Sequence, residues 1–317
     1  MDFEITILGS GSATPMRGRN MSAQVVKLNT EYILIDCGEG TQYQLLRYHI
    51  PHSKINHILI SHLHGDHFFG LVALVSTMNM LGRKTPLHIY GPPGLDEILT
   101  VQFRYSDTIL NYDMVFHVLK SDDSECIIDE ESWEVHTIPL SHRIRCNGFL
   151  IKEKPKRHRL HKPSLPERIT LAEIAQIKQG KNIHNDEGDV IYHADDYLLP
   201  PHRARSYAYC SDTCYYPEMF DIIKKVDVLY HESTFLDVMK SRAIDTFHTT
   251  AREAAITATS IECHTLIIGH FSSRYKELLP FLEEARPLFS KTFLGIEGTR
   301  ISIDERNEVA EYVHVQA

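Results

Sequence analysis

Short apolar runs recur along the whole chain, and segments with the periodicity of helices separate many of them. The runs are rich in Val, Ile, Leu and Tyr and occupy residues 3–11, 24–28, 32–38, 57–62, 87–91, 134–141, 148–153, 206–212, 226–232, 264–271 and 300–304. Residues 41–49 and 250–261 have the periodicity of helices. Because several runs are apolar on both alternating faces, they are typical of strands that helices cover. The pattern predicts an α/β architecture of two sheets with helices outside them.

Residues 152–201 interrupt this alternation. The first part, KEKPKRHRLHKPSLPER, is basic and punctuated by proline, residues 169–180 resemble a helix, and KNIHNDEGD is polar. Such a segment is typical of an insertion that protrudes from a core, although a long surface excursion without a role has the same composition. We therefore expect a single domain over residues 1–317 with an inserted basic arm over residues 152–201.

The composition is that of a globular protein. Of the 317 residues, 43% are hydrophobic, so the chain is long enough to bury a substantial core. No apolar run approaches the ~18 residues of a membrane span. Asp2 and Glu4 stand where a signal peptide would be basic. We expect a soluble, cytoplasmic protein with no membrane partner.

Six cysteines are spread along the chain, and we expect them to be reduced, because disulfide frameworks belong to small secreted domains. Cys210 and Cys214 have a spacing that zinc accepts, but no second cysteine pair follows them. A structural zinc site of cysteines is therefore the less favoured reading.

The charge distribution is uneven. A formal net charge of −9 argues against adhesion of the whole surface to nucleic acid. A local basic patch is still compatible with this charge. Basic residues concentrate at the start of the arm, namely Lys152, Lys154, Lys156, Arg157, Arg159 and Lys162.

Metal-capable side chains follow four of the apolar runs. The stretch ISHLHGDHFFG contains His62, His64, Asp66 and His67, and later runs are followed by His142, Asp212 and His270. Since strands of similar orientation end at the same edge of a sheet, we expect these side chains to converge there. Isolated core or surface histidines are the alternative, but they would not be this dense.

The first of these stretches has the spacing to serve two metal ions. His62 and His64 project to the same side of an extended segment, and Gly65 permits a turn that carries Asp66 and His67 to a second position. Imidazole and carboxylate ligands favour zinc or a similar ion. A set without cysteine indicates a catalytic rather than a structural site.

HLHGDH resembles the signature of the metallo-β-lactamase fold, a four-layer αββα sandwich that hosts several enzyme activities. The other motifs resemble those of the ribonuclease Z family. They are LGSGSATPMRGRN, DCGEGTQ, LSHRI, SDT, HEST, HTT and GHFSSRY, and they span nearly the whole chain. The length is similar to the short form of these enzymes, which is a homodimer.

The resemblance implies a zinc-dependent endoribonuclease that removes the 3′ trailer from precursor tRNA and leaves a 3′-hydroxyl on the tRNA. It assigns His62, His64 and His142 to one zinc ion, and Asp66, His67 and His270 to the other, with Asp212 bridging them. Manganese is the alternative metal. A hydroxide shared by the two metals would attack the phosphodiester. Asp66 would orient this hydroxide or accept its proton.

The leaving ribose oxygen needs a general acid. His248 is our candidate, because it lies just before TARE, where Thr250 and Glu253 have the spacing of a capping box at a helix start. Glu232 in HEST matches the residue that partners this histidine in the family. Arg274, near another expected helix start, suits a phosphate clamp.

Further residues suit RNA contacts. Arg17 and Arg19 lie in PMRGRN, which is similar to the family's loop near the cleavage site. GEGTQ (residues 38–42) begins a helix in which Thr41 and Gln44 have capping-box spacing, so its amides could contact phosphate, with a structural turn as the alternative. In the family the arm grips the tRNA elbow, which makes Lys154, Lys156, Arg157 and Arg159 candidates. The Gly-Pro motif of the family arm is absent, and Leu171 and Ala172 stand at its place.

Two other functions compete with this one. A dinuclear hydrolase of the same fold could act on small phosphodiesters or other esters, and a non-catalytic relative could merely bind RNA. Seven metal-capable residues argue against the binding module, which needs none. The basic arm together with HEST and HTT favours RNA over small esters.

Overall fold

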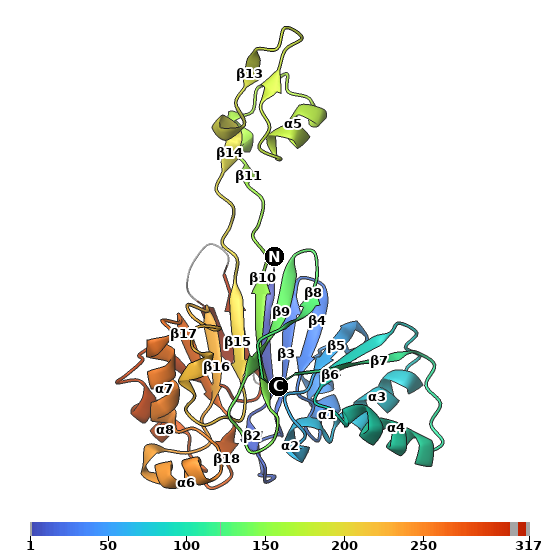
Figure 1. Cartoon of the computed structure of the whole chain (residues 1–317), viewed down its shortest axis with the longest axis vertical. Coiled ribbons are helices and arrows are strands. Elements are labelled where there is room, and N and C mark those ends of the chain that lie inside the picture. The colour runs from blue at the N-terminus through green and yellow to red at the C-terminus, as the bar shows by residue number, and fades with distance from the viewer. Residues whose placement is uncertain (1, 121, 305–309, 315–317) are drawn as a thin grey trace.

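Two β-sheets pack face to face, and helices lie outside each of them (Figure 1). The structure is a computed structural model that describes residues 2–120, 122–304 and 310–314. Over these residues, the strand order is β21-β20-β1-β3-β4-β5-β6-β7 in the first sheet and β19-β17-β16-β15-β10-β9-β8 in the second. The predicted four-layer αββα sandwich is confirmed.

The first sheet contains the strands β1 (Phe3–Gly9), β3 (Ala23–Leu28), β4 (Glu31–Ile35), β5 (Ile55–Leu59), β6 (Leu87–Gly91), β7 (Met114–Val118), β20 (Thr299–Ile303) and β21 (Ala310–His314). Strands β4 to β7 run parallel to one another. Helices α1 (Thr41–Arg47), α3 (Leu71–Met80) and α4 (Leu95–Tyr105) contribute Leu45, Leu74 and Leu99 to the apolar cluster on its outer face.

The second sheet contains β8 (Cys126–Asp129), β9 (Trp133–Pro139), β10 (Asn147–Glu153), β15 (Ser206–Cys210), β16 (Val228–Glu232), β17 (Thr265–Gly269) and β19 (Thr292–Leu294). Helices α7 (Ala251–Ser260) and α8 (Leu279–Ala285) cover it. Shorter elements are β2 (Gly11–Ser12), β18 (Phe271–Ser272), α2 (Gly65–Phe68), α6 (Lys240–Asp245), η1 (His52–Lys54), η4 (Pro217–Met219) and η5 (Asp237–Met239).

The core lies between the two sheets. Phe3 and Ile5 of β1 meet Phe149 of β10 and Tyr207 and Tyr209 of β15, and all five side chains are almost fully buried. Burial of this apolar surface is the main driving force for stacking the sheets. Each predicted apolar run contains a strand, which confirms the predicted alternation.

An arm leaves the sandwich at the end of β10 and returns at the start of β15, and it extends well beyond the two sheets (Figure 1). Its elements are β11 (Arg159–Leu160), η2 (Lys162–Ser164), α5 (Leu171–Ile177), β12 (Ile183–His184), β13 (Val190–Tyr192), η3 (Ala194–Tyr197) and β14 (Leu198–Leu199). A small apolar cluster of Ile177, Ile183 and Ala194 holds it together. Because β10 continues to Glu153, the projecting segment begins after that residue rather than at Lys152.

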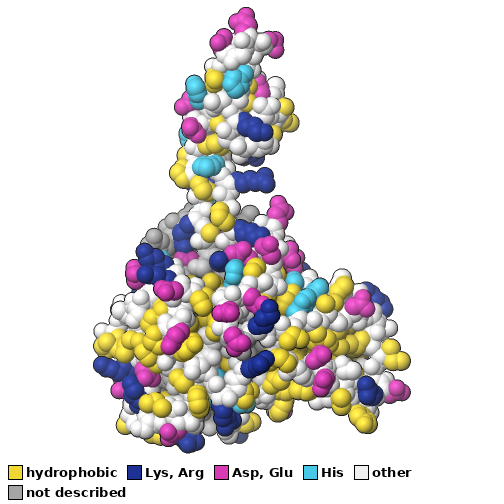
Figure 2. All heavy atoms as spheres, in the orientation of Figure 1, with side chains coloured by type: hydrophobic (Ala, Val, Ile, Leu, Met, Phe, Trp, Pro, Cys, Tyr) yellow, Lys and Arg dark blue, Asp and Glu magenta, His cyan; other side chains and the backbone are white. Residues whose placement is uncertain are grey.

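The arm is not basic as a whole. Residues 154–202 contain eight Lys and Arg and seven Asp and Glu. Figure 2 shows acidic side chains at the far end of the arm, where Asp186, Glu187 and Asp189 lie between β12 and β13. Five of the eight basic residues lie in the first part of the arm, from Lys154 to Lys162.

None of the helices in the described part of the chain combines the length and the hydropathy that a membrane-spanning segment requires.

A buried ion pair anchors the base of the arm. The Arg205 guanidinium, 2% exposed, donates to both carboxylate oxygens of Glu153 at 2.9 and 2.6 Å and to the Ile303 carbonyl at 2.7 Å. Burial alone would raise the pKa of Glu153, but Arg205 and Lys156 lower it. The pair therefore joins the arm exit to the first sheet.

We predict that Arg205→Ala lowers the free energy of unfolding by about 3–5 kcal/mol, because it leaves a buried carboxylate without its partner. Since the pKa of Glu153 is lower in the folded state, its contribution is fully present above the ordinary glutamate pKa of about 4.3, declines below it and is lost as pH falls through the folded-state pKa. Urea denaturation at pH 7 and at pH 3.5 measures both effects. Lys154→Ala, which breaks a surface pair with Asp129, is the control and should change the free energy of unfolding far less. An equal, small loss in both variants would contradict the prediction.

Candidate dinuclear metal centre

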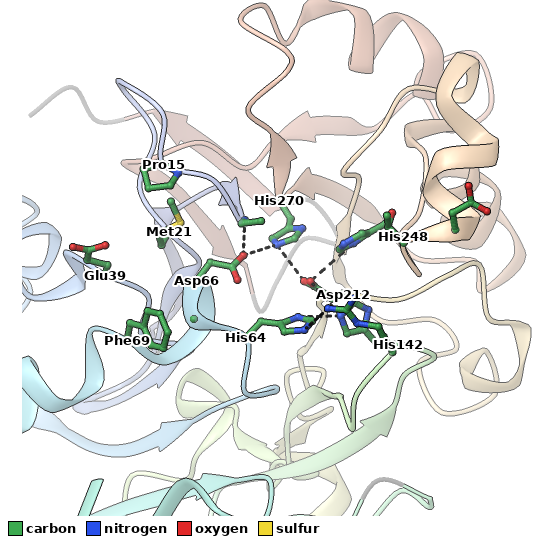
Figure 3. Close-up of a pocket in the computed structure, with 15 residues that line it drawn as sticks. Pro15, Met21, Glu39, His64, Asp66, Phe69, His142, Asp212, His248 and His270 are labelled. Carbon is green, nitrogen blue, oxygen red and sulfur yellow. Dashed lines mark hydrogen bonds and ion pairs between the residues drawn. The ribbon is translucent and has the colours of Figure 1, made fainter. Parts of the chain in front are cut away.

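The predicted metal-capable residues meet at one edge of the two sheets. His62 follows β5, His142 follows β9, Asp212 follows β15 and His270 follows β17. His142, Asp212 and His270 line a cavity of about 560 Å³, together with His64, Asp66 and His248 (Figure 3). Strands from both sheets therefore deliver side chains to the same opening, as their carboxyl ends predict.

One group of ligand atoms comprises His62, His64, His142 and Asp212. The Nδ1 atom of His64 lies 3.0 Å from Nε2 of His62 and 3.2 Å from Nε2 of His142. Oδ2 of Asp212 lies 3.6 and 3.8 Å from the same two Nε2 atoms. Three imidazole nitrogens and one carboxylate oxygen thus surround a common point.

A second group comprises Asp66, His67 and His270. The Nε2 atoms of the two histidines are 3.3 Å apart, and Oδ2 of Asp66 lies 3.4 Å from each. Asp212 turns its other oxygen, Oδ1, to this group, at 3.3 Å from His67 and 3.2 Å from His270. One carboxylate therefore spans both groups, with one oxygen for each.

The local backbone explains how neighbouring residues reach different groups. His64 precedes α2 in an extended conformation, so His67 lies one helical turn further on. A Cβ atom at Gly65 would stand 2.2 Å from the Phe69 ring, so a larger residue here would have to displace that ring. His270 has a φ of 60°, a left-handed conformation that is costly for a residue with a side chain. Such strain is typical of residues whose direction matters for function.

Hydrogen bonds fix the outward nitrogen of most of these rings. His67 donates from Nδ1 to Oδ2 of Asp36 at 2.7 Å, and His142 donates from Nδ1 to the Phe247 carbonyl at 3.0 Å. Nδ1 of His270 contacts the Thr234 hydroxyl at 2.9 Å. In each case Nδ1 is engaged, so Nε2 is the nitrogen that faces the other ligand atoms and would bind a metal ion.

Asp36 and Thr234 are functional residues that the sequence reasoning did not single out. Asp36 is fully buried, and it also accepts from the Ser61 amide at 2.8 Å and from the Tyr209 hydroxyl at 2.7 Å. A signal for Asp36 was present, because it follows the apolar run YILI just as Asp212 follows SYAYCS. Thr234 does not follow an apolar run directly, but it is the last residue of the HEST motif.

The electrostatics of the centre favour a cation. Burial lowers the pKa of His62 and of His142, so both rings are neutral. Burial would also lower the pKa of His67, but the carboxylates of Asp212, Asp66 and Asp36 raise it well above its ordinary value. Three buried carboxylates around one imidazole leave an excess of negative charge, which divalent cations would offset.

His248 and Glu232 form a pair beside the two groups. Nδ1 of His248 lies 2.7 Å from Oε1 of Glu232, which is fully buried and also accepts from the Thr213 amide at 3.1 Å. Burial alone would lower the pKa of His248, but Glu232 raises it to about 9. The expected capping box of Thr250 and Glu253 is present at the start of α7, two residues after His248. A protonated imidazole is thereby held at the cavity (Figure 3).

The ribonuclease Z of Cytophaga hutchinsonii is 55% identical to this chain over 306 residues, which are 96% of this chain and 98% of that protein. The chain belongs to the ribonuclease Z family. Human tRNase Z, short form, is a solved structure with 27% identity and a TM-score of 0.69 that covers 95% of this chain and 99% of its own. A metallo-β-lactamase fold protein of Bacillus subtilis shares the fold at 17% identity and a TM-score of 0.67, over 95% of this chain and 100% of that one.

A family model described as Anti-Pycsar protein Apyc1 also matches, over residues 3–165. That segment contains five of the seven predicted ligands, from His62 to His142, and ends before Asp212 and His270. The ribonuclease Z relative, in contrast, matches nearly the whole chain, including the HEST and HTT region.

The residues that the ribonuclease Z resemblance assigned to RNA lie in different settings. Arg274 is exposed, but it lies in a turn after β18 and not at a helix start as expected, since α8 begins at Leu279. Arg17 is exposed, whereas Arg19 donates to the carbonyl oxygens of Ser272 and Tyr275. Arg19 therefore fastens one loop at the cavity to another.

The capping box expected in GEGTQ is absent. Gly40, with a φ of 84°, caps α1, and the Thr41 hydroxyl donates to the Gly38 carbonyl at 2.7 Å instead. A left-handed residue at the cap turns the Thr41 side chain away from the helix amides. Thr41 thus stabilises the loop between β4 and α1.

The basic residues of the arm are partly engaged within the protein. Lys154 contacts Asp129 at 2.6 Å and Lys156 contacts Glu153 at 3.0 Å. Arg159 donates from Nε to the Pro200 carbonyl at 2.9 Å. Arg157 lines a second cavity, of about 540 Å³, with His158 and Lys178. None of these four predicted RNA contacts lines the metal-capable cavity.

We predict that Asp36→Asn weakens metal binding by about 10–100-fold, because it removes the carboxylate that orients His67. Metal content after dialysis against a graded series of chelator concentrations measures the effect. Asp2→Asn, an exposed aspartate, is the control and should retain wild-type affinity. A folded Asp36→Asn protein with unchanged metal affinity would show that this hydrogen bond does not support the centre.

Proposed function

We propose that this chain is a metal-dependent endoribonuclease that cleaves precursor tRNA at its 3′ side, releases the trailer and leaves a 3′-hydroxyl on the tRNA. The observation that carries the proposal is Asp212, which presents one oxygen to each of two ligand groups in a cavity that also holds His248. Membership of the ribonuclease Z family supports the substrate, because the relatives carry that name and a similar solved structure is a tRNase Z.

Two zinc ions are the proposed cofactor, with manganese as the alternative. The donor set consists of His67, four further histidine imidazoles and two aspartate carboxylates. Such nitrogen and oxygen ligands suit zinc. When bound, a metal pair lowers the pKa of a water and offsets the charge that develops on the phosphate. The two ligand groups and the shared Asp212 fit this role.

His248 is the proposed general acid. Because Glu232 occupies Nδ1, the other ring nitrogen, Nε2, is left to protonate the departing ribose oxygen. The pKa of about 9 keeps the ring protonated at neutral pH. Glu232 stays in place because Thr234 donates to it from its amide at 2.9 Å and from its hydroxyl at 2.8 Å.

Asp66 is the proposed residue that orients the nucleophile. Its Oδ2 atom accepts from the Ala13 amide at 2.7 Å, which ties the ligand to the loop after β2. The His67 and His270 rings, against the effect of burial, hold its pKa well below the ordinary range. An always ionised carboxylate can accept a hydrogen bond from a water and fix its direction.

RNA would be held by exposed arginines at the cavity and by the arm. Arg274 and Arg17 are exposed beside the loops that line the cavity. Arg157 and Arg159 lie further out, on the near part of the arm, with Lys154 and Lys156 at its base. We also propose that the chain acts as a homodimer in the cytoplasm. Exposed apolar side chains of α1 and α3 support the dimer, namely Tyr43 (67%), Leu46 (66%) and Met80 (75%).

The direct test is to map the ends of the products from one precursor tRNA. We expect a single cut that leaves the tRNA with a 3′-hydroxyl, and we expect His64→Ala to abolish it, because this variant loses a predicted ligand. Hydrolysis of small phosphodiesters without any site-specific cut in precursor tRNA would favour the rival small-ester hydrolase. Activity that survives both His64→Ala and chelation would contradict the metal centre itself.

We predict that His248→Ala slows hydrolysis by about 10²–10⁴-fold without loss of metal, because a general acid acts on the leaving group and not on the ligands. Single-turnover rates and metal analysis of the same preparation measure the two effects. Glu232→Gln should retain metal and slow the reaction in the same direction. Loss of metal from His248→Ala would instead assign this histidine to the ligand set.

We predict that replacing residues 157–202 by a short linker weakens precursor tRNA binding but preserves hydrolysis of a small chromogenic phosphodiester. The proposed catalytic residues all lie outside this segment, and the Glu153–Arg205 pair remains. Each lost phosphate contact of Arg157, Arg159 or Lys162 should reduce the slope of log affinity against log salt by roughly 0.7–0.9. Circular dichroism verifies folding first.

A matched control neutralises the acidic end of the arm with Asp186→Asn, Glu187→Gln and Asp189→Asn. This triple variant should bind precursor tRNA at least as well as the parent. If the arm replacement binds and cuts precursor tRNA like the full chain, with the same salt slope, the arm does not contact the substrate.

A further inference from the structure

A second kind of metal-capable cluster lies outside the dinuclear centre, on the outer face of the second sheet. Cys126 belongs to the edge strand β8, and Glu134 and His136 belong to its neighbour β9. One ligand atom of each residue lies within 4.8 Å of the other two. His136 is six residues before the predicted ligand His142, which corresponds to roughly 20 Å along an extended strand. The two sites therefore do not share a ligand.

The strand register brings these side chains to one face. Cys126 is the direct cross-strand partner of His136, and Glu134 lies two residues away on the same side of β9. A register shift between Cys126 and Ile128 allows Ile128 to pack in the core while Cys126 stays exposed. Bulges of this kind redirect side chains, and they are frequent next to functional sites.

Two of the three polar groups pair with each other. Nε2 of His136 forms an ion pair with Oε1 of Glu134 at 3.1 Å, and the Cys126 thiol donates to the Ile128 carbonyl at 3.3 Å rather than to either of them. Lys152 lies 2.9 Å from the same Glu134 oxygen and keeps the Glu134 pKa below its ordinary value. An ionised carboxylate, an imidazole nitrogen and a thiol within 4.8 Å of one another are the components of a metal site.

We propose that Cys126, Glu134 and His136 form a metal site for zinc or a similar borderline transition metal, separate from the dinuclear centre. Tetrahedral zinc places a sulfur at ~2.3 Å and nitrogen or oxygen at ~2.0–2.2 Å, so paired ligand atoms stand roughly 3.4–3.6 Å apart. Small side-chain rotations reach that spacing from the observed cluster. A thiolate ligand disfavours magnesium, calcium and manganese, and water completes the fourth position.

Metal binding here releases the thiol proton of Cys126, because only the thiolate is a good ligand. The S–H bond breaks, the proton passes to solvent, and a bond forms between the metal and the thiolate sulfur. Lys152 opposes binding, since its ammonium holds the same carboxylate and repels a cation. Removal of Lys152 should therefore strengthen the site, whereas removal of a ligand should weaken it. These opposite directions distinguish a built site from nonspecific adsorption.

The test uses the full chain with its dinuclear centre already loaded with zinc. Added Co²⁺ should produce a thiolate-to-cobalt charge-transfer band that saturates at about one ion per chain. The seven residues of the proposed dinuclear centre include no cysteine, so cobalt there does not produce this band. Cys126→Ser should eliminate the band, and His136→Ala or Glu134→Gln should weaken binding by more than about tenfold.

Lys152→Ala should bind cobalt more tightly than the parent, and Glu131→Gln, an exposed acid outside the cluster, should bind it as the parent does. A second measurement follows alkylation of Cys126, the exposed cysteine. Zn²⁺ at micromolar concentration should slow this alkylation in the parent but not in His136→Ala.

Three results would overturn the site: no thiolate band in the parent, a band that persists in Cys126→Ser, or equal zinc protection of Cys126 with and without His136. Because the cluster lies at the surface of the sheet, circular dichroism should be the same for all variants. The outcome is independent of precursor tRNA cleavage, so failure of this proposal leaves the proposed function untouched.

Discussion

A carboxylate buried between two groups of imidazoles is the interaction on which the centre depends. Asp212 is almost fully buried, and its two oxygens each face a different group at 3.2–3.8 Å. Burial alone would raise its pKa, but the His270 and His67 rings hold it well below the ordinary range. A charge in this position is tolerated only where cations surround it. The surrounding ligands, their hydrogen bonds and the strained backbone at His270 all hold positive groups around this buried carboxylate.

The packed sandwich keeps Asp212 and the surrounding imidazoles at fixed distances. Ligands arrive from strand ends of both sheets, so any sliding of one sheet over the other would separate Asp212 from His67. The core of Phe3, Ile5, Phe149, Tyr207 and Tyr209 prevents such sliding. Tyr209 connects the core to the centre directly, since its hydroxyl donates to Asp36, which in turn accepts from His67. Packing and ligand orientation are thus parts of one network.

The arm is held together much less tightly than the sandwich. Its own apolar cluster is small, its acidic and basic residues nearly balance in number, and the buried Glu153–Arg205 pair fixes only its base. Such a segment can vary in charge without disturbing the metal-capable cavity, because the ligands lie at the opposite ends of β9 and β15. Chemistry and proposed RNA capture are therefore separable in the same chain.

Local patterns in the sequence determined the α/β layers and the convergence of the ligands, because hydrophobic periodicity and strand-end position are properties of neighbouring residues. His62, Asp212 and His270 could be found in this way. Only the tertiary structure decided that Asp36 and Thr234 orient the rings, that Gly40 replaces Thr41 as a cap, and that Arg19 is bound by backbone carbonyls. It also brought Cys126 next to His136. These contacts join residues far apart in the chain through strand register and sheet packing, which no short stretch of sequence encodes.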